Sequence, residues 1–307
     1  YLEGNDLTSI DVTDNPNLAY LRVYNNDLSV LDLTFNPDIN YIHTTGNDSL
    51  SCIYVSDIEY AQENWTINID SWTSLCQGTI LQNYTYVPDD NFEQALIDLG
   101  YDDVLDDYVV TDSINSVTTL NVSNDSISDL TGIEDFIALE SLNCSYNQLT
   151  SLTLSSVAPM TGYLLCTANQ LTSLDVSNYP DLNHLNVEQN LLTALDVSSN
   201  TALTNLNCYY NQLDSLDVSS NTALTNLHCG YNQLTSLDVS SNTALTNLNC
   251  YSNLLTSLDV SANTALTSLY CSNNLLTHLN MRNGVTDALT TFNATNNDSL
   301  ECIETLD

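Results

Sequence analysis

The chain has 307 residues, of which 39 are Asp or Glu and two are Lys or Arg, so its formal net charge is -37. Arg22 and Arg282 are its two fixed cations, whereas a phosphate backbone requires clustered Lys and Arg, and an anionic membrane would repel this surface. No stretch reaches the roughly 20 apolar residues of a membrane span. The composition therefore excludes nucleic acid and direct membrane insertion, and it favours a saline, extracellular setting.

The first 50 residues carry copies of a repeat of 21 residues. Leu18 and Ile39 open two copies, and a partial copy is visible at Asn5 and Leu7. In a full copy, apolar side chains occupy positions one, four, six and eleven, and asparagine occupies position nine. Alternation over positions three to six predicts a short strand with one face buried.

The repeat stops near Leu50, and the segment that follows is expected to be a cap. It holds Trp65 and Trp72, which suit the covering of an apolar end. Cys52 and Cys76 both lie in this cap, where a bridge would staple a loop-rich element, and we predict a disulfide between them. Residues 1–84 are therefore interpreted as the C-terminal end of a first repeat module with its disulfide cap.

Residues 88–100 predict a short helix, because aspartate opens the segment, apolar residues fall on one face and Gly100 follows its end. We interpret residues 85–116 as the N-terminal helical cap of a second module. Just after the helix come four carboxylates, Asp102, Asp103, Asp106 and Asp107. Clustered carboxylates suit Ca²⁺, but this run lacks the spacing of an EF-hand loop, so a solvated acidic turn is the alternative.

Residues 117–307 are interpreted as the second module with a truncated C-terminal cap, and the repeat is most regular here. Copies open at Val117, Leu139, near Thr161, and at Leu182, Leu203, Leu224, Leu245, Leu266 and Leu289. The pattern resembles the leucine-rich repeat L-x-x-L-x-L-x-x-N-x-L, with Cys often in place of the third Leu. This resemblance implies a solenoid with parallel strands on its concave face, little helix, and tandem modules with caps. The asparagines at position nine are expected to form a ladder that bonds backbone groups at the bend.

The module opening carries a second resemblance. The run from Tyr86 to Asp107, followed by Ile127-Ser128-Asp129-Leu130-Thr131-Gly132-Ile133, is similar to module openings in leucine-rich-repeat cell-surface proteins of the Bacteroidota. Those proteins are typically large, modular and exported, many by the type IX route. The resemblance implies a bacterial cell-surface location.

Cysteine positions separate two classes of thiol. Six cysteines take the inward sixth position of the repeat, where a free thiol packs as a small hydrophobe; these are Cys144, Cys166, Cys208, Cys229, Cys250 and Cys271. An occasional disulfide between neighbouring coils is the alternative, since their spacing allows it. Cys302 corresponds to Cys52, because the segment 297–303 repeats the segment 47–53, and we expect its partner beyond Asp307.

A column of aspartates recurs in the Leu-Asp-Val-Ser segment of the repeat. Stacked carboxylates repel one another, so we expect hydrogen bonds from Ser, Thr or backbone donors to compensate, with bound cations as the alternative. The column comprises Asp11, Asp32, Asp175, Asp196, Asp217, Asp238 and Asp259.

The outward side chains of the concave face form an uncharged stripe of amides and phenols, which suits glycans or proteins. The alternative is that they are merely soluble strand residues of a recently duplicated repeat. The candidate ligand-binding residues are Asn205, Asn207, Tyr209, Asn226, His228, Asn247, Asn249, Tyr251 and Tyr270. His184 and His228 are too far apart for one metal, and no triad or phosphate loop is visible, so no enzyme activity is expected.

We therefore expect an extracellular structural or adhesive repeat protein that mediates surface contact or forms part of a cell-surface filament. Its partner would be a protein or glycan on another surface, or copies of itself. The alternative is a glycan- or protein-binding module appended to a secreted enzyme. No cofactor is expected, except possible Ca²⁺. Five Asp-Ser pairs before Leu or Ile resemble the O-glycosylation signal of exported Bacteroidota proteins: Ser49, Ser113, Ser126, Ser215 and Ser299.

Overall fold

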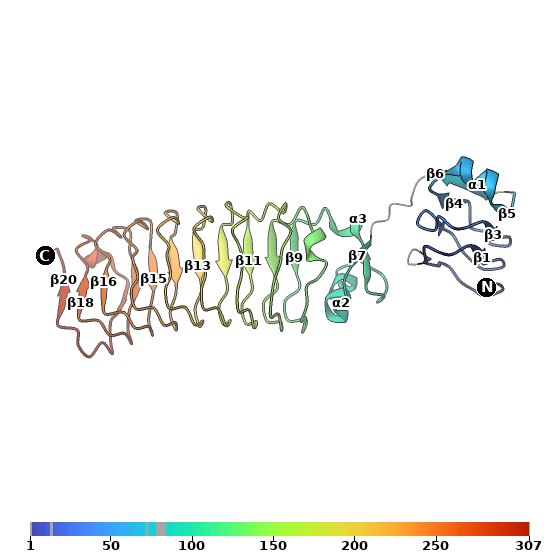
Figure 1. Ribbon diagram of the computed structural model, residues 1–307. Coiled ribbons are helices and arrows are strands. Elements are labelled where there is room, and N and C mark those ends of the chain that lie inside the picture. Colours follow the sequence, from blue (N-terminus) through green and yellow to red (C-terminus); the bar gives the residue numbers. More distant parts are fainter. Residues whose placement is uncertain (1, 13–14, 72, 78–83, 307) are drawn as a thin grey trace. The chain divides into compact units, whose positions relative to one another are not determined.

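The computed structural model describes residues 2–12, 15–71, 73–77 and 84–306. The chain divides into two compact units, Tyr1–Asn83 and Tyr84–Asp307 (Figure 1). This division falls one residue from the expected module boundary. Trp72, one of the two tryptophans expected in the first cap, lies outside the described residues.

The first unit is a short stack of coils with two parallel sheets. One sheet joins β1 (Tyr20–Arg22), β3 (Tyr41–His43) and β5 (Thr66–Asn68), and the other joins β2 (Leu31–Asp32), β4 (Cys52–Val55) and β6 (Ser74–Gln77). The helix α1 (Ile58–Asn64) lies between β4 and β5 in the chain, and the Asp57 side chain caps its N-terminus. The predicted disulfide is confirmed: Cys52 of β4 is bonded to Cys76 of β6, the neighbouring strand.

The second unit begins with the predicted helical cap. The strands β7 (Tyr84–Tyr86) and β8 (Tyr108–Val110) pair antiparallel. The helix α2 (Asp90–Asp98) lies between them in the chain, and α3 (Thr111–Ile114) follows β8. The Asp89 carboxylate caps α2 through Oδ1, and its Oδ2 accepts hydrogen bonds from Ser128 and from the Asp129 N–H. One side chain therefore ties the cap to the first coils.

The main sheet of the second unit is parallel and runs along the stack of coils (Figure 1). Its strands cover positions three to five of each copy, as predicted. They are β9 (Thr119–Asn121), β10 (Ser141–Asn143), β11 (Tyr163–Leu165), β12 (His184–Asn186), β13 (Asn205–Asn207), β14 (Asn226–His228), β15 (Asn247–Asn249), β17 (Ser268–Tyr270) and β19 (Thr291–Asn293). We call the outward surface of this sheet the strand face; it is the surface that the sequence predicts to be concave.

The Leu-Asp-Val segment forms regular strands in some coils of the second unit and lacks them in others. Near the end of the chain it forms a second parallel sheet of β16 (Ser257–Asp259), β18 (His278–Asn280) and β20 (Cys302–Glu304). In the preceding coils the same segment has no strand pairing, although both of its apolar side chains are buried, as Leu216 and Val218 are. Short 3-10 helices occur at Ile133–Asp135 and Thr286–Ala288.

A single apolar core runs through the second unit. Leu206, Leu227 and Leu248 at position four, and Cys208 and Cys229 at position six, are at most 1% exposed. A fully buried leucine stabilises the fold by roughly 1.5–3 kcal/mol, and each coil contributes several such side chains only when its neighbours cover them.

Two asparagine ladders close the bends of the coils. The strand-end ladder, at position nine, was predicted: each Nδ2 donates to backbone carbonyls of its own and the preceding coil, while each Oδ1 accepts an N–H from the preceding coil. It comprises Asn147, Asn169, Asn190, Asn211, Asn232, Asn253, Asn274 and Asn297. The far-bend ladder, Asn200, Asn221, Asn242 and Asn263, was not predicted, and all four residues are fully buried.

Candidate ligand-binding face

In-register pairing arranges the outward side chains of the strand face in two rows. The first row runs from His184 through Asn205, Asn226 and Asn247 to Ser268. The second row contains the residues two positions later, Asn186, Asn207, His228, Asn249 and Tyr270. Each row is therefore continuous across the coils, although the residues are 21 apart in the sequence.

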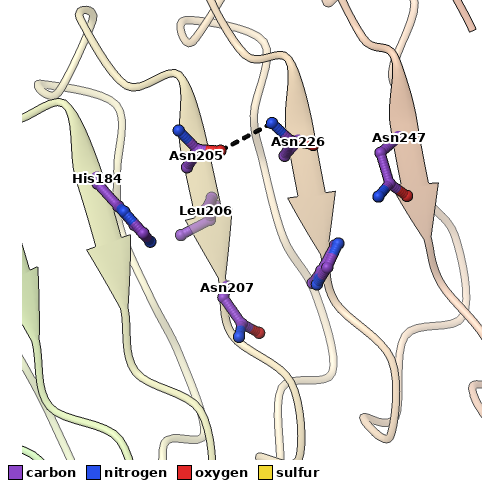
Figure 2. A pocket seen from close by; sticks show the side chains of 7 residues that line it. His184, Asn205, Leu206, Asn207, Asn226 and Asn247 are labelled. Carbon is purple, nitrogen blue, oxygen red and sulfur yellow. Dashed lines mark hydrogen bonds between the residues drawn. The ribbon is translucent and has the colours of Figure 1, made fainter.

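A shallow pocket of about 290 Å³ lies over β12 to β15, where these rows run side by side (Figure 2). It is lined by His184, Asn205, Leu206, Asn207, Asn226, His228 and Asn247. Five of these seven residues belong to the predicted ligand-binding set. The other two are His184, which is the β12 member of the first row, and the buried Leu206.

Hydrogen bonds within the face hold its amides in place. Asn226 Nδ2 donates to Asn205 Oδ1 at 2.8 Å (Figure 2). Asn207 Nδ2 donates to Glu188 Oε2 at 2.8 Å. In contrast, Asn247 Oδ1 is buried beside the pocket, and no donor of the described residues lies within hydrogen-bonding distance of it. The Asn247 oxygen is shielded from solvent, so the pocket offers a ligand its other amides and its imidazoles.

Both imidazoles of the pocket are half-buried and favour the neutral form. Burial lowers the pKa of His184 below its usual range. Burial also lowers the pKa of His228, although the nearby Glu188 carboxylate acts in the opposite direction. A neutral imidazole offers one donor and one acceptor, so these rings can hydrogen-bond a hydroxyl from either side.

Beyond the carboxyl ends of β13 to β15 lies a cluster of four phenols, Tyr209, Tyr210, Tyr231 and Tyr251, which we call the tyrosine patch. The Tyr209 and Tyr251 hydroxyls are 2.6 Å apart, although one whole coil lies between the coils that carry them. Their contact passes over Gly230, where an added Cβ would lie 3.0 Å from the Tyr251 ring and carbonyl oxygen. Burial and the Tyr251 hydroxyl raise the pKa of Tyr209.

Tyr210 and Tyr231 complete the tyrosine patch and were not in the predicted set. Their rings are 5.5 Å apart between centroids, and each ring also contacts Tyr209. They occupy position eight of the repeat, where the backbone is left-handed with φ of 56° and 48°. Other coils place asparagine, glycine, alanine, glutamine, serine or another tyrosine at this position, so the sequence did not mark these two tyrosines as part of a site.

The remaining predicted ligand-binding residues, Asn249 and Tyr270, lie in the second row beyond the pocket. Asn249 Oδ1 accepts a 3.4 Å hydrogen bond from the Tyr251 N–H. The first unit also carries outward aromatic side chains. The Tyr20 and Tyr41 rings are stacked with centroids 4.1 Å apart, and the Arg22 guanidinium lies over both rings.

The predicted calcium ligands do not gather into one site. Three metal-ligating groups within 4.8 Å of one another occur in the described residues only at His278, Cys302 and Glu304. Asp102, Asp103, Asp106 and Asp107 therefore provide no assembled cluster. The acidic loop is held instead by buried Glu93, whose carboxylate accepts hydrogen bonds from the backbone N–H groups of Asp106 and Tyr108.

The cluster at His278, Cys302 and Glu304 is already occupied by protein contacts. The Glu304 carboxylate is 3.3 Å from His278 Nε2 and forms a 2.7 Å ion pair with Arg282. Cys302 is exposed and has a free thiol. Since it corresponds to the disulfide-bonded Cys52, a disulfide remains the prediction for this residue.

The aspartate column is compensated as predicted. In the second unit, each carboxylate of the column accepts a hydrogen bond from the backbone N–H of the serine two residues later. These carboxylates are Asp175, Asp196, Asp217, Asp238 and Asp259. Together with the hydroxyls of the same serines, these bonds hold the pKa of the column below its usual range despite repulsion between neighbouring coils.

The six repeat cysteines are fully buried and free, so their predicted role in core packing is confirmed. Cys144 Sγ and Cys166 Sγ are 3.6 Å apart. Burial raises the pKa of the Cys208 thiol to about 12, which keeps it protonated. The predicted glycosylation sites at Ser49, Ser113, Ser126, Ser215 and Ser299 are all exposed and remain predictions.

Among the described residues, no helix is both long and apolar enough to cross a membrane.

Comparison with known proteins identifies the class of fold. No protein-family model and no curated protein matches the chain. Among solved structures, the functional domain of InlJ from Listeria monocytogenes is 32% identical, with a TM-score of 0.54 over 73% of this chain and 62% of that one. The description of that domain says that it includes a cysteine ladder. The fold is thus a leucine-rich-repeat solenoid, and the predicted fold class is confirmed.

Two more distant structures support the fold alone. An internalin C2 from Listeria monocytogenes is 21% identical, with a TM-score of 0.51 over 74% of this chain and 99% of that one. A leucine-rich-repeat protein of Leptospira interrogans is 17% identical, with a TM-score of 0.53 over 97% of this chain and 81% of that one. The chain spans 62% of the InlJ domain, so the activity of the whole protein is a matter for proposal.

Proposed function

We propose that this chain is an extracellular adhesion module that holds a partner on the strand face of its second unit. One observation carries the proposal. The pocket over β12 to β15 is lined by amides and neutral imidazoles, in a chain whose net charge is -37. Such a face can contact another surface through short-range hydrogen bonds, with little need for charge pairing.

The fold and the class of its neighbours support this function. Leucine-rich-repeat proteins, the internalins among them, are typically interaction modules, and stacked coils also supply a stiff spacer between a cell surface and a partner. Repeats of this kind need no catalytic constellation to act. The same architecture suits a cell-surface appendage, which is the filament role expected from the sequence.

An extracellular location rests on three features. The Cys52–Cys76 disulfide is typical of oxidising compartments, and the acidic surface suits a saline medium. The module opening at Tyr86–Asp107 resembles exported Bacteroidota proteins. A type IX export route is part of this proposal and rests on that resemblance.

A charge placed in the pocket tests the proposal. The full chain is immobilised, and its attachment to cells, to surface proteins and to glycans is measured for the parent, for Asn226→Glu and for Ser220→Glu. Asn226 lines the pocket, whereas Ser220 is exposed on the far bend, so both variants add the same charge at different places. We expect Asn226→Glu to weaken attachment at least about tenfold and Ser220→Glu to leave it unchanged.

Equal attachment by the two variants and the parent would contradict the proposal. Melting temperatures of both variants are measured alongside, so that a loss of attachment through unfolding is separated from a blocked pocket.

A further inference from the structure

We infer that the partner held on the strand face is a neutral glycan, with the tyrosine patch as the stacking platform and the adjoining pocket as the hydrogen-bonding site. This inference rests on the proposed function and names the chemical class of its partner. Three observations support it: exposed rings, matched hydrogen-bonding groups and the distribution of charge.

The rings of the tyrosine patch are available to a ligand. Tyr210 is 55% exposed and Tyr231 is 44% exposed, while the hydroxyls of Tyr209 and Tyr251 bond each other behind them. A sugar ring presents a face of C–H groups, which packs on an aromatic ring in the way that other apolar or cationic surfaces do. Fixing two of the rings through a hydroxyl contact reduces the entropy that binding would cost.

The pocket beside the patch offers donors and acceptors together. His184 and His228 are neutral imidazoles, for which no hydrogen bond within the described residues is observed. The amides of Asn205, Asn207 and Asn226 line the pocket beside them. Sugar hydroxyls donate and accept at the same atom, so they fit a site in which both kinds of group alternate.

Charge selects a neutral glycan over an acidic one. Of the two arginines of the chain, Arg22 is in the first unit and Arg282 is paired with Glu304, and neither lines the pocket. Glu188 beside Asn207 adds a negative charge at the edge. Sialylated or sulfated glycans would meet repulsion without a compensating cation.

Three variants at the same repeat position test the inference. Tyr210→Asn and Tyr231→Asn remove the exposed rings, and Tyr146→Asn is the matched control, because Tyr146 has φ of 59° and is 57% exposed but lies three coils away. The full chain is screened against an array of neutral, sialylated and sulfated glycans. Affinities for the selected neutral oligosaccharide are then measured by calorimetry.

We expect a neutral oligosaccharide to bind with Kd below about 1 mM, and the Tyr210→Asn and Tyr231→Asn pair to weaken it at least about tenfold. Tyr146→Asn should bind as the parent does. All three substitutions should raise the melting temperature, by roughly 2 °C each, because asparagine tolerates the left-handed conformation. Lost binding with a raised melting temperature identifies a binding role and excludes a structural one.

The other outcomes overturn the inference. Binding of acidic glycans alone, or neutral binding that survives loss of both rings, contradicts it. If no glycan binds while attachment to a protein surface remains sensitive to Asn226→Glu, the partner is a protein, and the proposed function stands without this inference. If no attachment responds to Asn226→Glu, both fall.

Discussion

The two asparagine ladders use one side chain in two ways. In the strand-end ladder, both ends of the carboxamide are paired: Asn253 Nδ2 donates to the Cys229 and Cys250 carbonyls, and its Oδ1 accepts the Leu234 N–H. In the far-bend ladder, Asn242 Nδ2 donates to the Val218 and Asn221 carbonyls, but its buried Oδ1 has no donor in the described residues. Both ladders therefore supply donors to backbone carbonyls, and only the strand-end ladder also supplies an acceptor to a backbone N–H.

Removal of a strand-end asparagine should have the largest effect. Asn253→Ala removes one of the two asparagine donors of the Cys229 and Cys250 carbonyls and leaves the buried Leu234 N–H without an acceptor. We expect it to lower the free energy of unfolding by about 3 kcal/mol. Denaturant unfolding measures the change. Gln233→Ala, at an exposed position of a neighbouring coil, serves as the control and should stay within about 0.5 kcal/mol. A loss no larger than that of the control would contradict the ladder's role.

The corresponding change in the far-bend ladder should be milder. Asn242→Ala removes two hydrogen bonds to the Val218 and Asn221 carbonyls, which each keep a backbone N–H donor, and it removes an oxygen that is already buried without a donor. We expect a loss of about 2 kcal/mol in the same measurement. A loss equal to or above that of Asn253→Ala would mean that the far-bend oxygens are paired in solution, for example with buried water.

Acid should weaken the far bend through the aspartate column beside it. Hydrogen bonds from serine lower the pKa of Asp196, Asp217 and Asp238 from the ordinary value of 3.8. Because the folded-state pKa is depressed, the stabilisation is present above the unfolded value and is lost as pH falls through the folded one. The triple Asp→Asn variant should therefore lose less stability between neutral pH and pH 2 than the parent does. Parallel pH profiles would contradict this.

The reactivity of the thiols tests the core between the ladders. This test needs no substitution, and the expected reaction of the native core is the smallest effect. The structure has seven free cysteines, of which Cys302 alone is exposed. We expect an aromatic disulfide reagent at pH 8 to leave the six repeat thiols unreacted in the native chain and to titrate them after unfolding in denaturant without reductant, since buried thiols are protonated and inaccessible. Rapid reaction of more than one native thiol would show that the stack opens.

The sequence predicts those features that a fixed spacing encodes. Asparagine at position nine, the inward cysteines and the strand at positions three to five follow from the repeat, and the Asp89 cap of α2 follows from local helix signals. The far-bend ladder was missed because asparagine in Ser-Asn-Thr-Ala also suits an ordinary turn, and nothing in its local pattern marks full burial.

The site was predicted only in part, because its geometry depends on neighbouring coils. The rows of amides lie on one face as expected, since parallel register preserves repeat positions, and their role in binding stays a prediction. The contact between Tyr209 and Tyr251 was not foreseen, because it joins residues 42 apart and depends on the absence of a side chain at Gly230. The acidic run at Asp102–Asp107 contains no group of three carboxylates close enough for one metal ion in the structure, which favours the solvated acidic turn that the sequence also allowed.

Gly230 also bears on how this chain changes by duplication and deletion. Neighbouring copies are nearly identical, so unequal recombination can add or remove one coil and leave the rest of the stack unaltered. The fold tolerates such events, but the joined hydroxyls require a single glycine-bearing coil between Tyr209 and Tyr251. Gain or loss of that one copy would change the distance between the two tyrosines in a single genetic step, so copy number would alter the surface that is proposed to bind a partner.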